Sequence, residues 1–258
     1  MSDKNLFTTE RRHDILTQLK MKKKLLVTDL CAQYNVSQTT IRTDLNSLEK
    51  DGFLKRTHGG AILNAAVSFE LNSFQKEQKN IEEKMRIARI AAEQIHDNEI
   101  IALDTGTTTY CLAELLSEKK GLTIVTTDIQ IATLLENEPQ ITVILAGGLL
   151  RKGFSCTIGA ITNNILSSLK VDTVFLAANA VSIDGSLSTP DIEQAQVKKS
   201  LINMASRRVL LCDSSKFASS SFAAFANLKD IDLVITDTGI PADVLSSLHR
   251  KKTLIEMV

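Results

Sequence analysis

The larger, C-terminal part of this 258-residue chain alternates between short apolar runs and segments with helical spacing. In the helical segments, such as 81–95 and 191–206, apolar residues recur every three or four positions. The apolar runs have the length of strands: 100–103, 122–126, 141–146, 173–177, 209–212 and 233–236. Alternation of this kind predicts a mainly parallel sheet covered by helices, because parallel neighbours need long crossover connections. We therefore expect an α/β domain over residues 81–258.

Polar residues and glycines directly follow several of these strands. Because open parallel sheets bind ligands outside the carboxyl ends of their strands, we expect one binding site there. Its candidate residues are Asp104, Gly106, Thr107, Thr108, Thr127, Asp128, Gly147, Gly148 and Lys216. Each loop alone also suits a simple turn. Their repeated position at strand ends is what favours a site.

The first of these loops has the composition of an anion site. Gly106 stands between hydroxyl side chains just before a helical segment, where backbone amides and hydroxyls can hold an anion. Lys216 would neutralise a phosphate, while Asp104 or Asp128 would accept hydrogen bonds from sugar hydroxyls. A phosphorylated sugar is the ligand that this combination favours. The alternative is that the threonines only cap the helix.

Residues 1–63 have a different pattern, with three short helical segments. Apolar spacing predicts a helix over about 9–21, a second one from Thr28 to Tyr34, and a third that starts at Ser37 and ends near Gly52. Thr28 and Ser37 are placed to cap the second and third helices. With the tight turn between them, these two helices predict a helix-turn-helix.

The third helix has a polar face opposite its apolar stripe of Ile41, Leu45 and Leu48. Side chains of this kind hydrogen-bond to base edges in the major groove of DNA. The expected contacts are Ser37, Gln38, Thr39, Thr40, Arg42, Thr43 and Asn46. For an isolated amphipathic helix, a solvated face would be the preferred interpretation. The segment that follows favours DNA.

That segment predicts a basic β-hairpin, or wing. Residues 53–58 indicate a strand, Gly59 and Gly60 a turn, and residues 61–63 the returning strand. Its expected phosphate contacts are Lys55, Arg56, His58 and Gly59. The net charge of the chain is zero, but residues 1–63 hold 11 lysines and arginines against 7 acidic residues. A basic head on an acidic body suits a protein of which one part binds double-stranded DNA.

Other classes of protein are less compatible with the sequence. The apolar runs fall short of the roughly 18 residues of a membrane helix, and the first four residues lack a secretory pattern. We therefore expect a cytoplasmic protein with no membrane partner. The four cysteines have neither metal nor disulfide spacing. No P-loop or dinucleotide motif is present, so we expect neither a metal nor a cofactor.

Both parts of the chain resemble the DeoR family of bacterial regulators. The N-terminal likeness rests on Val36, Ser37, Thr40, Ile41, Arg42, Asp44, Leu45, Leu48, Glu49, Arg56, His58, Gly59, Gly60 and Ala61. The C-terminal likeness rests on Lys84, residues 104–108, Gly147, Gly148, Gly159, Gly185 and residues 213–217. Two positions depart from the family pattern: Thr43 replaces a usual second arginine, and Asp128 a usual asparagine.

The resemblance implies a winged helix-turn-helix over 1–63, a linker over 64–80, and over 81–258 an α/β sensor domain resembling sugar-phosphate isomerases. It implies a repressor of a sugar-metabolism operon whose binding to operator DNA responds to a phosphorylated sugar. Because one recognition helix covers few base pairs, we expect a homodimer or homotetramer.

Two alternatives remain open. One is an enzyme, a sugar-phosphate isomerase or deaminase with a helical extension, in which Asp104, Glu193 and Lys216 would move protons. None of the four histidines lies in the strand-end loops, which argues against it. The other is a DNA-binding adaptor that senses a protein partner instead of a small molecule.

Overall fold

The computed structural model describes residues 8–22, 24–50, 54–57, 59–63, 79–240, 244–246 and 254–258. Contacts divide the chain into two compact units, Met1–Phe69 and Glu70–Val258. Each unit has a hydrophobic core of its own. Of the predicted linker, only Lys79 and Asn80 lie within the described residues.

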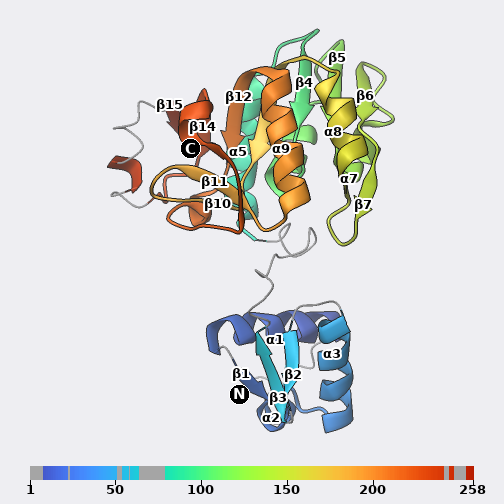
Figure 1. Cartoon of the computed structure of the whole chain (residues 1–258), viewed down its shortest axis with the longest axis vertical. Coiled ribbons are helices and arrows are strands. Elements are labelled where there is room, and N and C mark those ends of the chain that lie inside the picture. Colours follow the sequence, from blue (N-terminus) through green and yellow to red (C-terminus); the bar gives the residue numbers. More distant parts are fainter. Residues whose placement is uncertain are drawn as a thin grey trace. The chain divides into compact units, whose positions relative to one another are not determined.

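The described part of the N-terminal unit combines three helices with a small antiparallel sheet (Figure 1). Its elements are α1 (Thr8–Lys22), β1 (Lys24–Leu26), α2 (Val27–Tyr34), α3 (Gln38–Lys50), β2 (Leu54–Thr57) and β3 (Gly60–Leu63). Thr57 pairs with Gly60, so Gly60 belongs to the returning strand and not, as predicted, to the turn. β1, which pairs with β3, is too short to show a strand pattern in the sequence.

Gly60 is required by the close approach of β1. A Cβ atom at this position would stand 1.9 Å from the carbonyl oxygen of Leu25. Gly59, in contrast, has open space around it. The glycine pair therefore serves the packing of the central strand as well as the turn.

The two predicted helix caps have different outcomes. Ser37 is confirmed, because its hydroxyl accepts the backbone N–H of Thr40 at 3.1 Å. Thr28 is wrong, since the chain passes directly from β1 into α2 and Leu26 is the N-cap residue, without a side-chain cap. The Thr28 hydroxyl instead donates to the Asp29 carboxylate at 3.2 Å.

The C-terminal unit is built on a seven-stranded parallel sheet (Figure 1), which confirms the predicted α/β class. In spatial order the strands are β15 (Leu254–Met257), β14 (Leu233–Thr236), β12 (Ala205–Leu211), β9 (Val171–Ala177), β4 (Ile100–Leu103), β5 (Leu122–Thr126) and β6 (Ile141–Leu145). The helix predicted to reach residue 206 ends at Met204, and residues 205 and 206 belong to β12.

Helices cover both faces of this sheet. Among the described residues, the helices that cover it are α5 (Ile81–Glu93), α6 (Thr107–Ala113), α7 (Ile129–Leu135), α8 (Ala160–Ser167) and α9 (Ile192–Met204). Residues of α5, α6 and α7 form one hydrophobic core with the sheet, and residues of α8 and α9 belong to the other. Phe175 of β9 contributes to the first core and its neighbours Val174 and Leu176 to the second, as alternation along a strand requires.

Short hairpins and turns complete the unit. They are β7 (Leu149–Arg151), β8 (Cys156–Ile158), β10 (Ala180–Val181), β11 (Ser186–Thr189), β13 (Ala223–Asn227) and the 3-10 turns η1 (Ser214–Lys216) and η2 (Leu228–Asp230). The sequence analysis predicts none of these strands. Within the described residues, no helix is long and apolar enough to span a membrane.

The strand order reverses at the middle of the sheet. From β4 the chain adds β5 and β6 on one side, and then returns to place β9 against the other side of β4. The connections therefore diverge between β4 and β9, which leaves a crevice at the carboxyl ends of these strands.

Candidate functional site

The predicted DNA-reading side chains lie on the exposed side of α3. Gln38, Thr39, Arg42, Thr43 and Asn46 are exposed, whereas the stripe of Ile41, Leu45 and Leu48 is buried. Ser37, Lys55 and Gly59 are exposed and Thr40 and Arg56 half-buried, while His58 lies outside the described residues. That these residues contact DNA stays a prediction.

The wing is tied to the recognition helix. The backbone N–H of Arg56 donates to the Glu49 carboxylate at 2.7 Å, and its guanidinium donates to the Asn46 side chain at 2.5 Å. On the same helix, the Arg42 guanidinium donates to Gln38 at 3.2 Å. These bonds hold the wing and the polar face of α3 as one surface.

A buried charge cluster fixes α3 against α1. The Asp44 carboxylate, 1% exposed, accepts Arg11 Nε at 2.7 Å and Arg12 Nε at 2.8 Å. Arg12 also donates to the Ser47 hydroxyl at 2.9 Å. A displacement of α3 would separate Asp44 from its arginines and leave an uncompensated charge in the interior. The cluster therefore restricts the position of the recognition helix.

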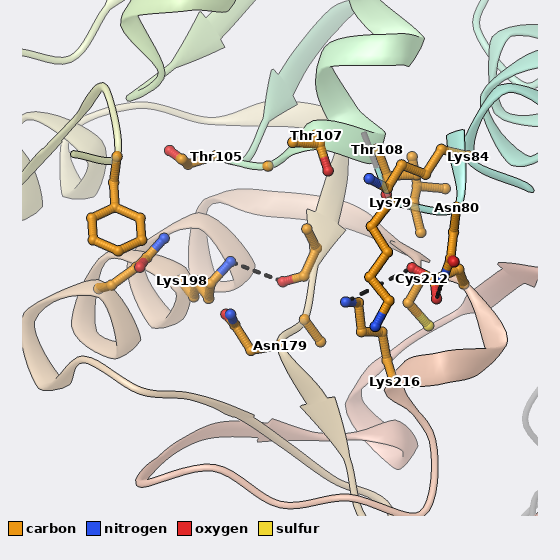
Figure 2. A pocket seen from close by; sticks show the side chains of 17 residues that line it. Lys79, Asn80, Lys84, Thr105, Thr107, Thr108, Asn179, Lys198, Cys212 and Lys216 are labelled. Atoms are coloured by element: carbon orange, nitrogen blue, oxygen red, sulfur yellow. Dashed lines mark hydrogen bonds and ion pairs between the residues drawn. The ribbon is translucent and has the colours of Figure 1, made fainter. Parts of the chain in front are cut away.

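In the C-terminal unit a pocket lies at the reversal point of the sheet (Figure 2). Its walls come from the segments that follow β4, β9 and β12 and from the residues at the start of α5. The lining residues are Lys79, Asn80, Lys84, Thr105, Gly106, Thr107, Thr108, Phe154, Ala177, Ala178, Asn179, Gln194, Lys198, Leu211, Cys212, Asp213 and Lys216. The pocket is thus where parallel sheets place their ligands.

Lysines dominate the charge of this pocket. Lys79, Lys84, Lys198 and Lys216 line it, and Asp213 is the one acidic residue among the lining residues that the structure describes. Lys79 is exposed, Lys216 half-buried, and Lys84 and Lys198 are buried. Cations held in a partly desolvated pocket attract an anion more strongly than the same cations would in water.

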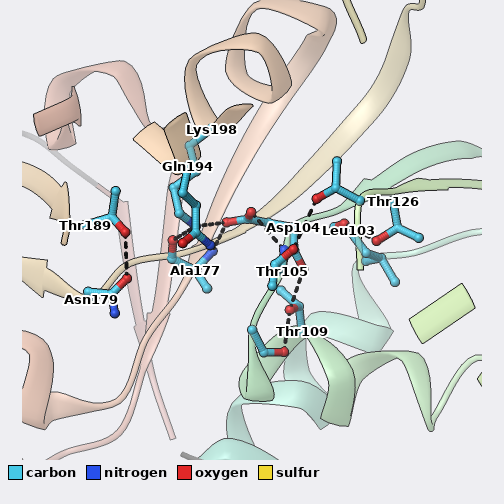
Figure 3. A network of polar contacts seen from close by, with 12 residues as sticks. Leu103, Asp104, Thr105, Thr109, Thr126, Ala177, Asn179, Thr189, Gln194 and Lys198 are labelled. Carbon is cyan, nitrogen blue, oxygen red and sulfur yellow. Dashed lines mark hydrogen bonds and ion pairs between the residues drawn. The ribbon is translucent and has the colours of Figure 1, made fainter. Parts of the chain in front are cut away.

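The floor of the pocket is a buried ion pair between Lys198 and Asp104 (Figure 3). The Lys198 ammonium also donates to the carbonyl oxygen of Ala177 at 2.8 Å. The Asp104 carboxylate in turn accepts the backbone N–H groups of Ala177 at 3.0 Å and Thr105 at 2.8 Å. One pair thus connects α9 to the ends of β9 and β4, on either side of the crevice.

Asp213 forms a second charge centre at the opposite wall. Its Oδ1 accepts Asn80 Nδ2 at 2.8 Å and the backbone N–H of Ser215 at 3.1 Å, and its Oδ2 lies 3.8 Å from Lys216 Nζ. Burial acts to raise the pKa of this carboxyl. The charge of Lys216 and the hydrogen bonds from Ser215 and Asn80 outweigh burial, so the pKa lies below its ordinary value.

The predicted ligand residues do not all reach the pocket. Gly106, Thr107, Thr108 and Lys216 line it, whereas Asp104 is 1% exposed and lies behind Lys198. The remaining predicted residues, Thr127, Asp128, Gly147 and Gly148, follow β5 and β6, on the far side of β4 from β9 and β12. Their contact with a ligand stays a prediction.

Local structure accounts for several of these positions. The Asp128 carboxylate caps α7 by accepting the N–H groups of Gln130 at 2.9 Å and Ile131 at 3.2 Å. A Cβ atom on Gly148 would stand 2.0 Å from the Thr162 hydroxyl oxygen, so close packing requires a glycine. A Cβ atom on Gly106 would stand 3.0 Å from the Ala177 Cβ. The absence of a side chain at Gly106 therefore lets the loop after β4 pack closely against the end of β9.

Lys198, Gln194, Asn179 and Asn80 are pocket residues that the sequence-based prediction misses. A signal for Lys198 exists: it falls on the apolar face of α9, with Ala195, Leu201 and Ile202. A lysine on such a face is unusual enough to suggest a paired or functional role. Asn80 lies in the predicted linker, where nothing in the sequence distinguishes it.

A winged helix-turn-helix joined to an α/β unit with a basic pocket defines the class of two-domain DNA-binding regulators. The model described as the DeoR-like helix-turn-helix domain matches residues 11–67, and that of the DeoR C terminal sensor domain matches residues 79–238. The chain belongs to the DeoR family of transcriptional regulators.

Named relatives agree with this assignment. The chain is 32% identical to the uncharacterized HTH-type transcriptional regulator FruR of Bacillus subtilis (strain 168), over 98% of this chain and 99% of that protein. It is also 32% identical to the glycerol-3-phosphate regulon repressor of Escherichia coli (strain K12), over 96% and 98% respectively. These names are those of transcriptional regulators, which are not enzymes.

Among solved structures, the chain is similar to ribose 5-phosphate isomerase A of Methanocaldococcus jannaschii. The match has a TM-score of 0.41 and 20% sequence identity, and it covers 54% of this chain and 55% of that one. At this level the similarity concerns the fold alone.

The buried position of Asp128 leads to a pH-dependent prediction. Burial, only partly opposed by the hydrogen bonds from Ile131 and Gln130, raises its pKa to about 6. Because the unfolded group has a pKa of about 3.9, Asp128 costs the wild-type protein stability as the pH rises from about 4 to about 6. Asp128→Asn keeps the cap without this cost. Above pH 6 it should be more stable by about 2–3 kcal/mol.

Urea unfolding of both proteins from pH 4 to pH 8 tests this, with the sensor domain followed by hydrogen exchange. The acid limb is an internal control: at pH 4 Asp128 is protonated in the folded state and about half protonated in the unfolded state, so the two proteins should differ there by only about 0.5 kcal/mol. A variant that is less stable than the wild type at pH 7 would refute the desolvation argument.

Proposed function

We propose that this chain represses a sugar-metabolism operon, and that a phosphorylated sugar bound in the pocket changes its affinity for operator DNA. The observation that carries the proposal is a pocket at the reversal point of the sheet that four lysines line, against the two carboxylates of Asp104 and Asp213. A phosphate brings nearly two negative charges and several acceptor oxygens, which such a set would neutralise.

The polar part of the pocket suits the remainder of such a ligand. Thr107, Asn179 and Gln194 supply hydroxyl and amide groups of the kind that hydrogen-bond to sugar hydroxyls. Phe154 provides an apolar surface on the same lining. The name of one relative, the glycerol-3-phosphate regulon repressor, also supports a phosphorylated metabolite as effector.

The enzyme alternative has less support. Of the three residues suggested for proton transfer, Asp104 is buried in its ion pair with Lys198 and Glu193 is exposed outside the pocket lining. Lys216 lines the pocket beside Asp213. The adaptor alternative can be distinguished from the proposed function, because it predicts that no small molecule changes operator binding.

The exposed face of α3 leads to a prediction about DNA. Arg42→Ala should weaken operator binding by about 1–3 kcal/mol if Arg42 reads a base, with a loss that depends on the operator sequence. Lys55→Ala should weaken binding to all sequences and lower the salt dependence by about one unit of slope. Fluorescence anisotropy on operator and scrambled DNA at several salt concentrations separates the two. Normal operator binding by folded Arg42→Ala protein would refute the assignment.

The short recognition helix leads to a prediction about assembly. One helix of 13 residues reads few base pairs, so a specific operator needs two copies of the chain. Sedimentation with and without operator DNA should therefore show a homodimer or a homotetramer. A monomer under both conditions would refute this part of the proposal.

The pocket leads to a prediction about the effector. Isothermal calorimetry with ribose 5-phosphate, fructose 1-phosphate, glucose 6-phosphate and glycerol 3-phosphate should identify a compound that binds, while the unphosphorylated compounds do not. The same compound should change operator affinity by at least about fivefold. Lys216→Ala and Thr107→Ala should reduce this response, because they remove a pocket cation and a pocket hydroxyl.

Lys229→Ala is the matched control, since Lys229 is an exposed lysine of the same domain outside this pocket. It should keep the full response. If none of the four phosphates binds, or if binding is unchanged in Lys216→Ala and Thr107→Ala, the pocket is not the effector site and the adaptor alternative gains support.

A further inference from the structure

The covalent connection to the DNA-binding unit enters the sensor domain at the pocket itself. Lys79 and Asn80 precede α5 directly, and both line the pocket (Figure 2). Every residue of the helix-turn-helix is joined to the sensor through this entry. A change at Asn80 is therefore a change in where the linker leaves the sensor domain.

The side chain of Asn80 is used in an unusual way. Asn80 is the N-cap residue of α5, yet it makes no side-chain cap. Its amide instead donates to Asp213 Oδ1 at 2.8 Å and to the Ser215 hydroxyl at 3.3 Å, more than 130 residues along the chain. The backbone of Asn80 is left-handed, with φ of 55°, a conformation that asparagine and glycine adopt most easily. The entry of the chain is thus held to the segment that follows β12.

Asp213 holds the pocket residues that an incoming anion would attract. Its carboxylate binds the Asn80 amide and faces the Lys216 ammonium at 3.8 Å. Its Oδ2 is buried and accepts no hydrogen bond among the described residues, so Lys216 is its charge partner without a close contact. The Asp213 carboxylate therefore serves as the protein's own anion for the Asn80 amide and the Lys216 ammonium.

A phosphate in the pocket would compete with Asp213 for these donors. It carries more charge than a carboxylate and has more acceptor oxygens. Asp213 keeps two hydrogen bonds when it releases them, because the backbone N–H and the hydroxyl of Ser215 also donate to its Oδ1. Both N–H groups of the Asn80 amide are in use, for Asp213 and for Ser215, so Asn80 can bind a phosphate only by leaving one of them. The Lys216 ammonium has no close hydrogen bond to Asp213, so a phosphate can draw it away.

We propose that Asn80, Asp213 and Lys216 form a latch. An anionic ligand opens it by drawing Lys216 and Asn80 away from Asp213. Occupancy of the pocket thereby changes the position at which the linker enters the sensor domain, and with it the affinity for operator DNA. This inference rests on the proposed function and adds its regulation. Asn80 is a positioning residue in this scheme. An effector shifts an equilibrium only through differential contacts in two states, and the latch supplies a difference of this kind.

The first test uses Asn80→Gly in the full-length protein. Glycine accepts the left-handed backbone, so the variant removes the amide while it keeps the local conformation. The readout is the ratio of operator dissociation constants with and without a saturating phosphate from the panel above, with saturation verified by calorimetry. Without the latch, the affinity of the unliganded variant should move toward that of the liganded wild type. The ratio should fall below about twofold, from at least about fivefold in the wild type.

Asn98→Gly is the matched control, because Asn98 also has a positive φ of 65° but lies outside the pocket lining. It should keep the wild-type ratio. A merely structural role of Asn80 would weaken operator binding equally in both states and leave the ratio unchanged. The latch would be overturned if Asn80→Gly kept the wild-type ratio of operator dissociation constants. It would also be overturned if this ratio fell equally in Asn80→Gly and Asn98→Gly.

The second test needs no effector. Asn80→Asp places a carboxylate against Asp213, so the two like charges should open the latch permanently. Operator affinity in the absence of any sugar phosphate should then differ from the wild type by at least about fivefold. An affinity within twofold of the wild type would overturn the latch. If no phosphate of the panel affects the wild type, the proposed effector fails, and this second test still decides on the latch.

Discussion

The buried ion pair between Lys198 and Asp104 is the interaction on which the sensor domain depends most. It lies at the point where the connections of the sheet diverge, and with the bonds to Ala177 and Thr105 it fixes the ends of β4 and β9 and one face of α9. A buried pair adds little net stability compared with apolar residues of the same size. What it contributes is geometry, because its loss from one side leaves an unpaired charge in the interior.

The order of the strands determines how much of the pocket can be predicted from the sequence. The alternation of strands and helices predicts the parallel sheet, and therefore the edge at which polar loops gather. It does not reveal the order of the strands, so the loops after β5 and β6 look as suitable as those after β4 and β12. Since β9 pairs with β4, the pocket forms on that side, with Gly106, Thr107, Thr108 and Lys216 in it. Thr127 and Gly147 follow strands on the other side.

The DNA-binding unit is more fully determined by local sequence. The cap of Ser37 and the stripe of Ile41, Leu45 and Leu48 are contacts within a few residues, and they define α3 without reference to the rest of the fold. The N-cap prediction for Thr28 is wrong because of a contact between residues far apart in the sequence. β1 exists because β3 is available to pair with it, and this distant partner shifts the start of α2 by one residue.

Both units hold a functional element through a buried aspartate that binds basic or amide donors. Asp44 holds α1 to the recognition helix through two arginines, whose fixed donor geometry suits a position that must not move. Asp213 holds Asn80 through a neutral amide and faces Lys216 at 3.8 Å, so its bonds are weaker and open to competition from another anion. Two arginines around Asp44 therefore suit a rigid surface, and an amide with a single lysine at Asp213 suits the adjustable metabolite pocket that we propose.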